Sequence, residues 1–306
     1  MNRDFKTEPV RAAILMVIAM ALIGVIDNLI SLVADHIGLW QFHLSRAMLA
    51  VPLILLLSVA GLGTIKPNSF WRVAVRSMLL GVSMLCYFGA LGIMPIAQAL
   101  AGLFTSPIFI LLITAFGMGQ RIGFWRISAA VLGFTGTIVV LQPDLEAFDW
   151  AILLPVAGGF FYALSAIATR ALCEGESTLS LLFGTMATLG IFGALGSLWF
   201  WMVPVPFEAA DFLTRGWVTD MTSVIWMIAA QAVVSVGGVF LIIRAYQIGE
   251  ASYVSVFEYS VMIFGPLFAW VAFGQGLGPA QMVGIAMIAV AGAIIALRSR
   301  SGSVSS

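Results

Sequence analysis

Hydrophobic residues gather in this chain into long, nearly uninterrupted runs separated by short polar stretches. A helix that crosses the hydrocarbon core of a bilayer needs about 20 consecutive apolar residues. Runs of this kind cover residues 12–34, 39–60, 71–92, 95–117, 123–141, 150–171, 179–203, 223–247, 251–273 and 278–297. A membrane-spanning β-barrel would instead show shorter segments that alternate apolar and polar positions. The pattern therefore predicts an all-α integral membrane protein with ten transmembrane helices.

The composition also indicates that most of the protein surface faces lipid. Of 306 residues, 61% are hydrophobic and 9% are charged, whereas a soluble domain carries about 25% charged residues. The net charge of zero gives no sign of a nucleic-acid partner. Cys86 and Cys173 lie in or beside apolar runs, without metal-ligand or redox spacing. We therefore expect no metal, no cofactor and no disulfide.

The first apolar run follows Arg3, Lys6 and Arg11, as the hydrophobic segment of a signal peptide would. It is longer than such a segment, and Leu32 stands where a cleavage site needs a small residue. We therefore expect it to be retained as the first spanning helix.

Basic residues predict the orientation. With a cytoplasmic N-terminus, all but two of the 14 Lys and Arg residues fall on or near the inner side. The exceptions are Arg46, inside the second run, and Arg215, in an outer loop. Cytoplasmic loops of membrane proteins carry an excess of Lys and Arg. We predict a multi-pass protein of a bacterial inner (plasma) membrane with both termini in the cytoplasm.

The two halves of the chain resemble one another. Gly119-Gln120 follows the fourth run and Gly274-Gln275 follows the ninth. Five spans in each half force the halves into opposite orientations, so we predict two inverted five-helix repeats, residues 1–147 and 148–306. Inverted repeats around a site at the membrane midplane are a recurrent design of secondary transporters. The repeat thus favours transport by alternating access, with a duplication of no functional meaning as the alternative.

Several short motifs carry a family resemblance over nearly the whole chain. They are Phe42-His43-Leu44-Ser45-Arg46, Ser106-Pro107-Ile108-Phe109, Leu132-Gly133-Phe134-Thr135-Gly136, Arg244-Ala245-Tyr246 and Phe257-Glu258-Tyr259-Ser260. Together they resemble the EamA-type branch of the drug/metabolite transporter superfamily. The last two motifs look most similar to members that carry riboflavin or S-adenosylmethionine. Gln120 and Gln275 stand where the family usually has Glu, so the resemblance implies no ionic role there.

Four ionisable residues stand out inside predicted spans, where each costs at least ~2.5–3.5 kcal/mol and therefore faces a cavity or a partner. They are Asp27, His43, Arg46 and Glu258. Asp27 and Arg46 are interpreted either as a structural ion pair or as an outer gate that contacts substrate. Glu258 is interpreted as a cavity residue that binds substrate or a proton, with pairing to Arg244 as the alternative.

Uncharged polar and aromatic residues extend the candidate site. Some can hydrogen-bond a polar solute, and the tyrosines can stack on a planar one; simple helix packing is the alternative for each. The complete set of substrate-binding or gating candidates is Asp27, Asn28, His43, Arg46, Tyr87, Gln98, Thr105, Tyr162, Arg244, Ser255, Glu258 and Tyr259.

The functional hypothesis is secondary transport of a small organic metabolite, with riboflavin uptake as the first candidate. Transport of S-adenosylmethionine, amino acids, drugs or metallophores, in either direction, stays as an alternative. A membrane-embedded enzyme or a non-transporting scaffold is the alternative of another class. No HExxH or GxxxxGK[ST] motif is present, so neither a zinc protease site nor ATP hydrolysis is expected. The expected partners are a small metabolite and the bilayer, in a monomer or a homodimer.

Overall fold

The structure, a computed structural model, describes residues 8–91, 93–94, 96–142, 150–206, 210–274 and 276–302. The secondary structure assigned within these ranges is entirely helical. The elements are α1 (Pro9–Ala34), α2 (Leu39–Val59), α3 (Phe70–Leu91), α4 (Ile96–Leu103), α5 (Ser106–Leu112), η1 (Ile113–Gly117), α6 (Phe124–Leu141), η2 (Trp150–Ile152), α7 (Leu153–Ala171), α8 (Thr178–Met202), α9 (Ile225–Ile248), α10 (Ala251–Val254), η4 (Ser255–Ser260), α11 (Val261–Phe273) and α12 (Pro279–Gly302).

The all-helical membrane fold predicted from the apolar runs is confirmed. In the part of the chain that the structure describes, ten helical segments are long and apolar enough to cross a membrane. Their ends differ from the predicted ones by only a few residues. The predicted boundary between the halves, at residues 147 and 148, lies outside the described residues.

The surface of the bundle is apolar and carries tryptophans near the ends of its helices. Trp71 and Trp125 stand near the starts of α3 and α6, Trp201 near the end of α8 and Trp226 near the start of α9, and all four are exposed. Tryptophan is enriched at the membrane–water interface because its ring is amphipathic. The exposed positions therefore fit a bundle whose helix ends lie at headgroup depth.

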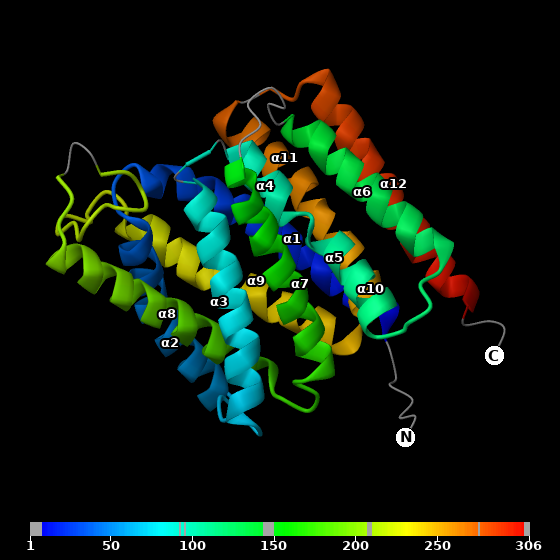
Figure 1. The fold of residues 1–306 in the computed structure, drawn as a ribbon, viewed down its shortest axis with the longest axis horizontal. Coiled ribbons are helices and arrows are strands. Elements are labelled where there is room, and N and C mark those ends of the chain that lie inside the picture. Colours follow the sequence, from blue (N-terminus) through cyan, green and yellow to red (C-terminus); the bar gives the residue numbers. More distant parts are fainter. Residues whose placement is uncertain are drawn as a thin grey trace.

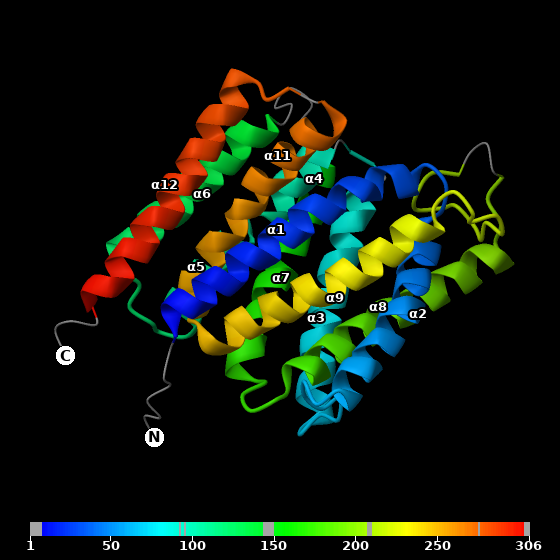
Figure 2. The same cartoon turned by 180° about the vertical axis from the view of Figure 1, so that it is seen from behind.

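Neighbouring helices run alongside one another in pairs. The α6 helix packs along α12, α1 along α9, α2 along α8 and α3 along α7 (Figures 1 and 2). The α6–α12 pair forms one edge of the bundle (Figure 1). We call the end where α1 begins and α12 ends the terminal face, and the end that carries Ala34 and Phe212 the distal face.

The fourth and ninth spans are both interrupted. The fourth divides into α4 and α5 where Thr105 Oγ1 donates to Gly102 O at 2.6 Å, just before Pro107. The ninth begins with the single turn α10, passes through the 3-10 stretch η4 and continues as α11. Interrupted segments at corresponding positions of two halves mark binding sites in many transporters. Here the interruptions bring Phe104 and Glu258 to the middle of the bundle.

Candidate functional site

A cavity of about 560 Å³ lies among the helices. Helices from both halves line it, chiefly α1, α3, α7, α9 and α11. Binding sites for small organic molecules have volumes of about 300–1,000 Å³, with mostly apolar walls and a few polar groups. The cavity is therefore large enough for one metabolite of drug-like size.

The cavity extends from the distal face past the middle of the bundle. Ala34, Phe212 and Gln281 line it near the distal face. Arg76 and Glu258 line it at its deep end. None of the described residues in the loops of the terminal face contributes to its walls. The deep end is thus closed off from the terminal face by packed protein.

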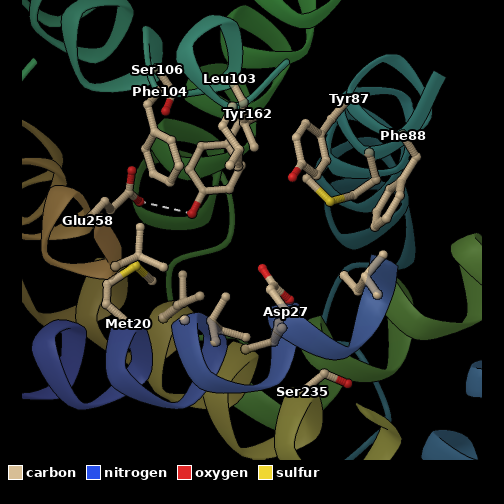
Figure 3. A pocket seen from close by; sticks show the side chains of 18 of the residues that line it. Met20, Asp27, Tyr87, Phe88, Leu103, Phe104, Ser106, Tyr162, Ser235 and Glu258 are labelled. Atoms are coloured by element: carbon tan, nitrogen blue, oxygen red, sulfur yellow. Dashed lines mark hydrogen bonds between the residues drawn. The ribbon is translucent and has the colours of Figure 1, made fainter. Parts of the chain in front are cut away.

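Two aromatic walls face each other across the cavity. Tyr87 and Phe88 of α3 form one wall, and Phe104 and Tyr162 form the other (Figure 3). The Tyr87 and Phe88 rings lie 5.1 Å apart in an edge-on arrangement. Aromatic rings placed in this way can hold a planar solute by stacking. Two of the three predicted stacking residues, Tyr87 and Tyr162, are therefore brought together by the fold.

Tyr259, the third predicted stacking residue, lies behind the cavity wall. It is fully buried, packs closely under Gly133 of α6, and its ring centroid is 6.4 Å from that of Phe104. Its hydroxyl has no hydrogen-bond partner among the described residues. Tyr259 thus supports the wall at Phe104 and does not line the cavity.

Asp27 points into the space between the aromatic walls (Figure 3). Its side chain is exposed although it lies well inside α1, because the cavity reaches it. Arg46 lines the same cavity but forms no ion pair with Asp27 within the described part of the chain. The interpretation of the two residues as a structural ion pair is therefore not supported by their geometry.

Arg46 is held by its own helix instead. Its Nη2 donates to Nδ1 of His43 at 3.3 Å, and its guanidinium lies 5.1 Å from the centroid of the Phe42 ring. His43 is fully buried, contacts Phe88 edge-on at 4.9 Å and does not line the cavity. His43 therefore orients Arg46 and has no direct access to the cavity.

Glu258 accepts two hydrogen bonds on the same oxygen. Tyr162 Oη donates to Oε1 at 2.9 Å (Figure 3), and Tyr246 Oη donates to the same atom. The alternative partner Arg244 lies outside the cavity lining and forms no ion pair with Glu258 in the described structure. Glu258 is thus a buried carboxylate, 2% exposed, that is stabilised by neutral donors.

The remaining predicted residues fall in different places. Asn28 lines the cavity and joins α1 to α11, since its Nδ2 donates to Gly24 O at 2.7 Å and lies 3.4 Å from Gly265 O. Thr105 caps the break in the fourth span, and Ser255 is buried; neither lines the cavity. The side chain of Gln98 lies outside the described residues.

Sequence reasoning missed Arg76, Tyr246 and Gln231, all of which line the cavity. Arg76 fits the excess of basic residues on the inner side, although its position inside the run 71–92 indicates burial. Tyr246 belongs to the Arg-Ala-Tyr motif, in which the sequence favours the charged Arg244 as the candidate. Gln231 donates to Ile26 O at 3.1 Å, and no sequence signal distinguished it from other polar residues in spans. No cluster of three potential metal ligands occurs in the described ranges.

Residues 149–297 match the EamA-like transporter family. Similarity to a riboflavin transporter of Rhizobium johnstonii covers 92% of this chain and 90% of that protein, with 27% identity. The second half of the chain is thus similar to EamA-like transporters. The family match and this relative confirm the resemblance drawn from the motifs.

Other relatives of the chain are also transporters by name. A riboflavin transporter of Vibrio cholerae is 23% identical, with 95% of each chain covered. An S-adenosylmethionine uptake transporter of Rickettsia bellii is 23% identical over 70% of this chain and 68% of that protein. One crystal structure shares the fold, with a TM-score of 0.77, 19% identity and coverage of 96% and 99% of the two chains. The protein is accordingly a membrane metabolite transporter of bacterial type.

Proposed function

We propose that this protein is a secondary transporter that takes up a small planar metabolite by alternating access, with riboflavin as the first candidate. The observation that carries the proposal is the pair of aromatic walls, Tyr87–Phe88 and Phe104–Tyr162, on facing sides of a cavity of about 560 Å³. A flat ring system inserted between them buries both of its faces. The relatives named as riboflavin transporters support this choice.

The packing of the helices supports two inverted halves. The α2–α8 and α6–α12 pairs each join a span to its counterpart in the other half. The α1–α9 pair joins spans one and eight, and the α3–α7 pair joins their counterparts, spans six and three. A twofold axis between the halves produces this set of pairs. Alternating access follows when the two halves exchange conformations.

The distribution of basic residues supports a cytoplasmic terminal face. Arg72, Arg121, Arg126 and Arg170 all lie at or near that end of the bundle, in keeping with the excess of positive charge in cytoplasmic loops. The cavity, which reaches the distal face, then faces the periplasm. This state is the one in which an uptake transporter binds its substrate.

S-adenosylmethionine is the second candidate, and Asp27 is the observation that favours it. An exposed carboxylate inside the cavity attracts a cation, and S-adenosylmethionine carries a sulfonium and an ammonium group. Its adenine ring is planar and can stack on the aromatic walls. Several relatives are named as uptake transporters of this compound.

Uptake of labelled riboflavin tests the proposal in a bacterial strain that neither makes nor imports riboflavin. We expect saturable uptake that depends on the protein and is lost when Tyr162 is replaced by Ala in a correctly inserted variant. Competition by unlabelled S-adenosylmethionine separates the two candidates. Absence of riboflavin uptake by a well-inserted wild type, together with uptake of S-adenosylmethionine, transfers the assignment to the second candidate. Uptake of neither contradicts the proposed substrate class.

A further inference from the structure

The guanidinium of Arg76 lies at the deep end of the cavity and is held by hydrogen bonds to neutral groups. Arg76 is only 3% exposed and lines the cavity. Its Nε donates to Thr169 Oγ1 at 3.0 Å, and its Nη1 donates to Thr185 Oγ1 and lies 3.4 Å from Leu181 O. No carboxylate lies within ion-pair distance of it in the described residues. All of its partners are neutral.

The second terminal nitrogen of Arg76, Nη2, can donate a hydrogen bond to a ligand. The Nη2 atom has no hydrogen-bond partner within the described ranges. It is also not one of the fully buried polar atoms that lack a partner, so it remains accessible from the cavity. A buried, unpaired charge inside a membrane protein is costly. A charge-assisted hydrogen bond to an acceptor that enters the cavity offsets part of that cost. The planar guanidinium is well suited to such an acceptor.

The arrangement of α7 separates this guanidinium from Glu258. Tyr162 contacts Glu258 and Thr169 contacts Arg76, and these two residues of α7 are two turns apart. Two turns of helix correspond to about 10 Å. The deep end of the cavity therefore presents a carboxylate and a guanidinium at two separate places, each fixed by neutral hydroxyl groups. A ligand that fills this space meets a hydrogen-bond donor at one place and an acceptor at the other.

We infer that Arg76, fixed by Thr169 and Thr185, is the subsite for a hydrogen-bond acceptor of the transported molecule. The acceptor is a ring carbonyl in a flavin and a carboxylate in an amino-acid-bearing solute such as S-adenosylmethionine. Arg76 determines specificity because solutes of equal size that lack an acceptor leave the guanidinium unpaired. This inference rests on the proposed function and adds the chemistry of one end of the substrate.

Ligand binding to the purified protein tests the subsite, with riboflavin followed by its fluorescence and S-adenosylmethionine by calorimetry. Arg76→Gln is expected to raise the Kd of whichever probe the wild type binds by about 10- to 100-fold, the range for a hydrogen bond to a charged group. Arg76→Lys is expected to restore part of the loss. The matched control is Arg72→Gln, which removes an exposed cation one turn earlier on α3 and is expected to leave Kd unchanged.

Thermal unfolding distinguishes a subsite from a purely structural link among α3, α7 and α8. A subsite predicts that Arg76→Gln abolishes the rise in unfolding temperature caused by ligand, because stabilisation follows from binding to the folded state. A structural link predicts a lower unfolding temperature without ligand and an unchanged Kd; that result would overturn the inference.

Chemical modification keeps the inference testable if the wild type binds neither probe. Phenylglyoxal is expected to modify Arg76 of the ligand-free protein, as mapped by mass spectrometry, with Arg72 as the exposed positive control. Modification of Arg76 without binding of either probe supports an accessible subsite and contradicts the proposed substrates alone. Failure to modify Arg76 while Arg72 reacts overturns the subsite itself.

Discussion

Tyr162 of α7 donates a hydrogen bond of 2.9 Å to Glu258 of η4. This bond joins α7 to the interrupted ninth span at the deep end of the cavity. Tyr246 of α9 donates to the same carboxylate oxygen. Two hydroxyl groups from two helices thus fix one charge in the bundle interior. A substitution at Glu258 that keeps a hydrogen-bond acceptor therefore tests the role of the negative charge alone.

Glu258→Gln is expected to lower uptake about 10-fold or more while the protein remains inserted. The amide oxygen still accepts both hydroxyl bonds, so only the charge and its interaction with substrate are lost, and hydrogen bonds to charged groups contribute about 1.5–3 kcal/mol. Initial rates of riboflavin uptake, normalised to the amount of protein in the membrane, provide the measurement. Uptake equal to wild type would show that the carboxylate has no part in transport.

Asp27→Asn is expected to distinguish between neutral and cationic substrates. Removal of the exposed carboxylate should weaken binding of S-adenosylmethionine by about 10-fold or more, since an ionic interaction in a partly desolvated site is lost. Binding of uncharged riboflavin should change much less. Asp35→Asn, at the distal end of α1, serves as the control, because Asp35 is exposed and does not line the cavity. Equal losses for both solutes would contradict an electrostatic role of Asp27.

Gly284→Ala is expected to destabilise the α6–α12 pair by about 1–3 kcal/mol, the usual cost of overpacking. A β-carbon at this position would lie 2.6 Å from Gly136 O and 2.9 Å from Val140 N, and neither backbone atom can move freely. Gly123→Ala is the matched control, since nothing lies within 4 Å of the added carbon there. Thermal unfolding in detergent measures the difference, and equal unfolding temperatures would contradict the close approach of the two helices.

Glu176 is expected to hold the terminal face closed. Its carboxylate accepts from the backbone N–H groups of Asn68 at 2.8 Å and Ser69 at 2.6 Å, which joins the start of α3 to the loop between α7 and α8. Glu176→Ala removes both bonds. The population open at the terminal face should then rise, because these bonds stabilise the closed arrangement seen in the structure.

Cys173 reports this opening, since it is 1% exposed beside the same loop. Burial is the largest influence on its thiol and raises the pKa, so the reactive thiolate is scarce near neutral pH and becomes more abundant as pH increases. Maleimide labelling in a Cys86→Ala background should be slow in the wild type, faster at higher pH and several-fold faster in Glu176→Ala. Labelling at the wild-type rate in the variant would argue against the closing role of Glu176.

The ten spans and their ends were predictable from sequence. A helix in lipid must satisfy its backbone hydrogen bonds within itself, so its existence depends on local apolar length alone. The break in the fourth span was not predicted, although Pro107 stands at the start of α5. The family resemblance could also be recognised from the sequence, because each of its motifs is a short contiguous stretch of the chain.

The composition of the site depended on tertiary structure. Arg244 and Tyr246 are two residues apart on α9, and at 3.6 residues per turn they point to nearly opposite sides; only Tyr246 reaches Glu258. Arg72 and Arg76 differ by one turn of α3, yet one is exposed and the other is buried between α7 and α8. The sequence by itself determined which segments span the membrane and which ionisable groups they contain. Only the tertiary structure decided which of those groups share a cavity, because the rotation of each helix is set by packing against partners from the other half of the chain.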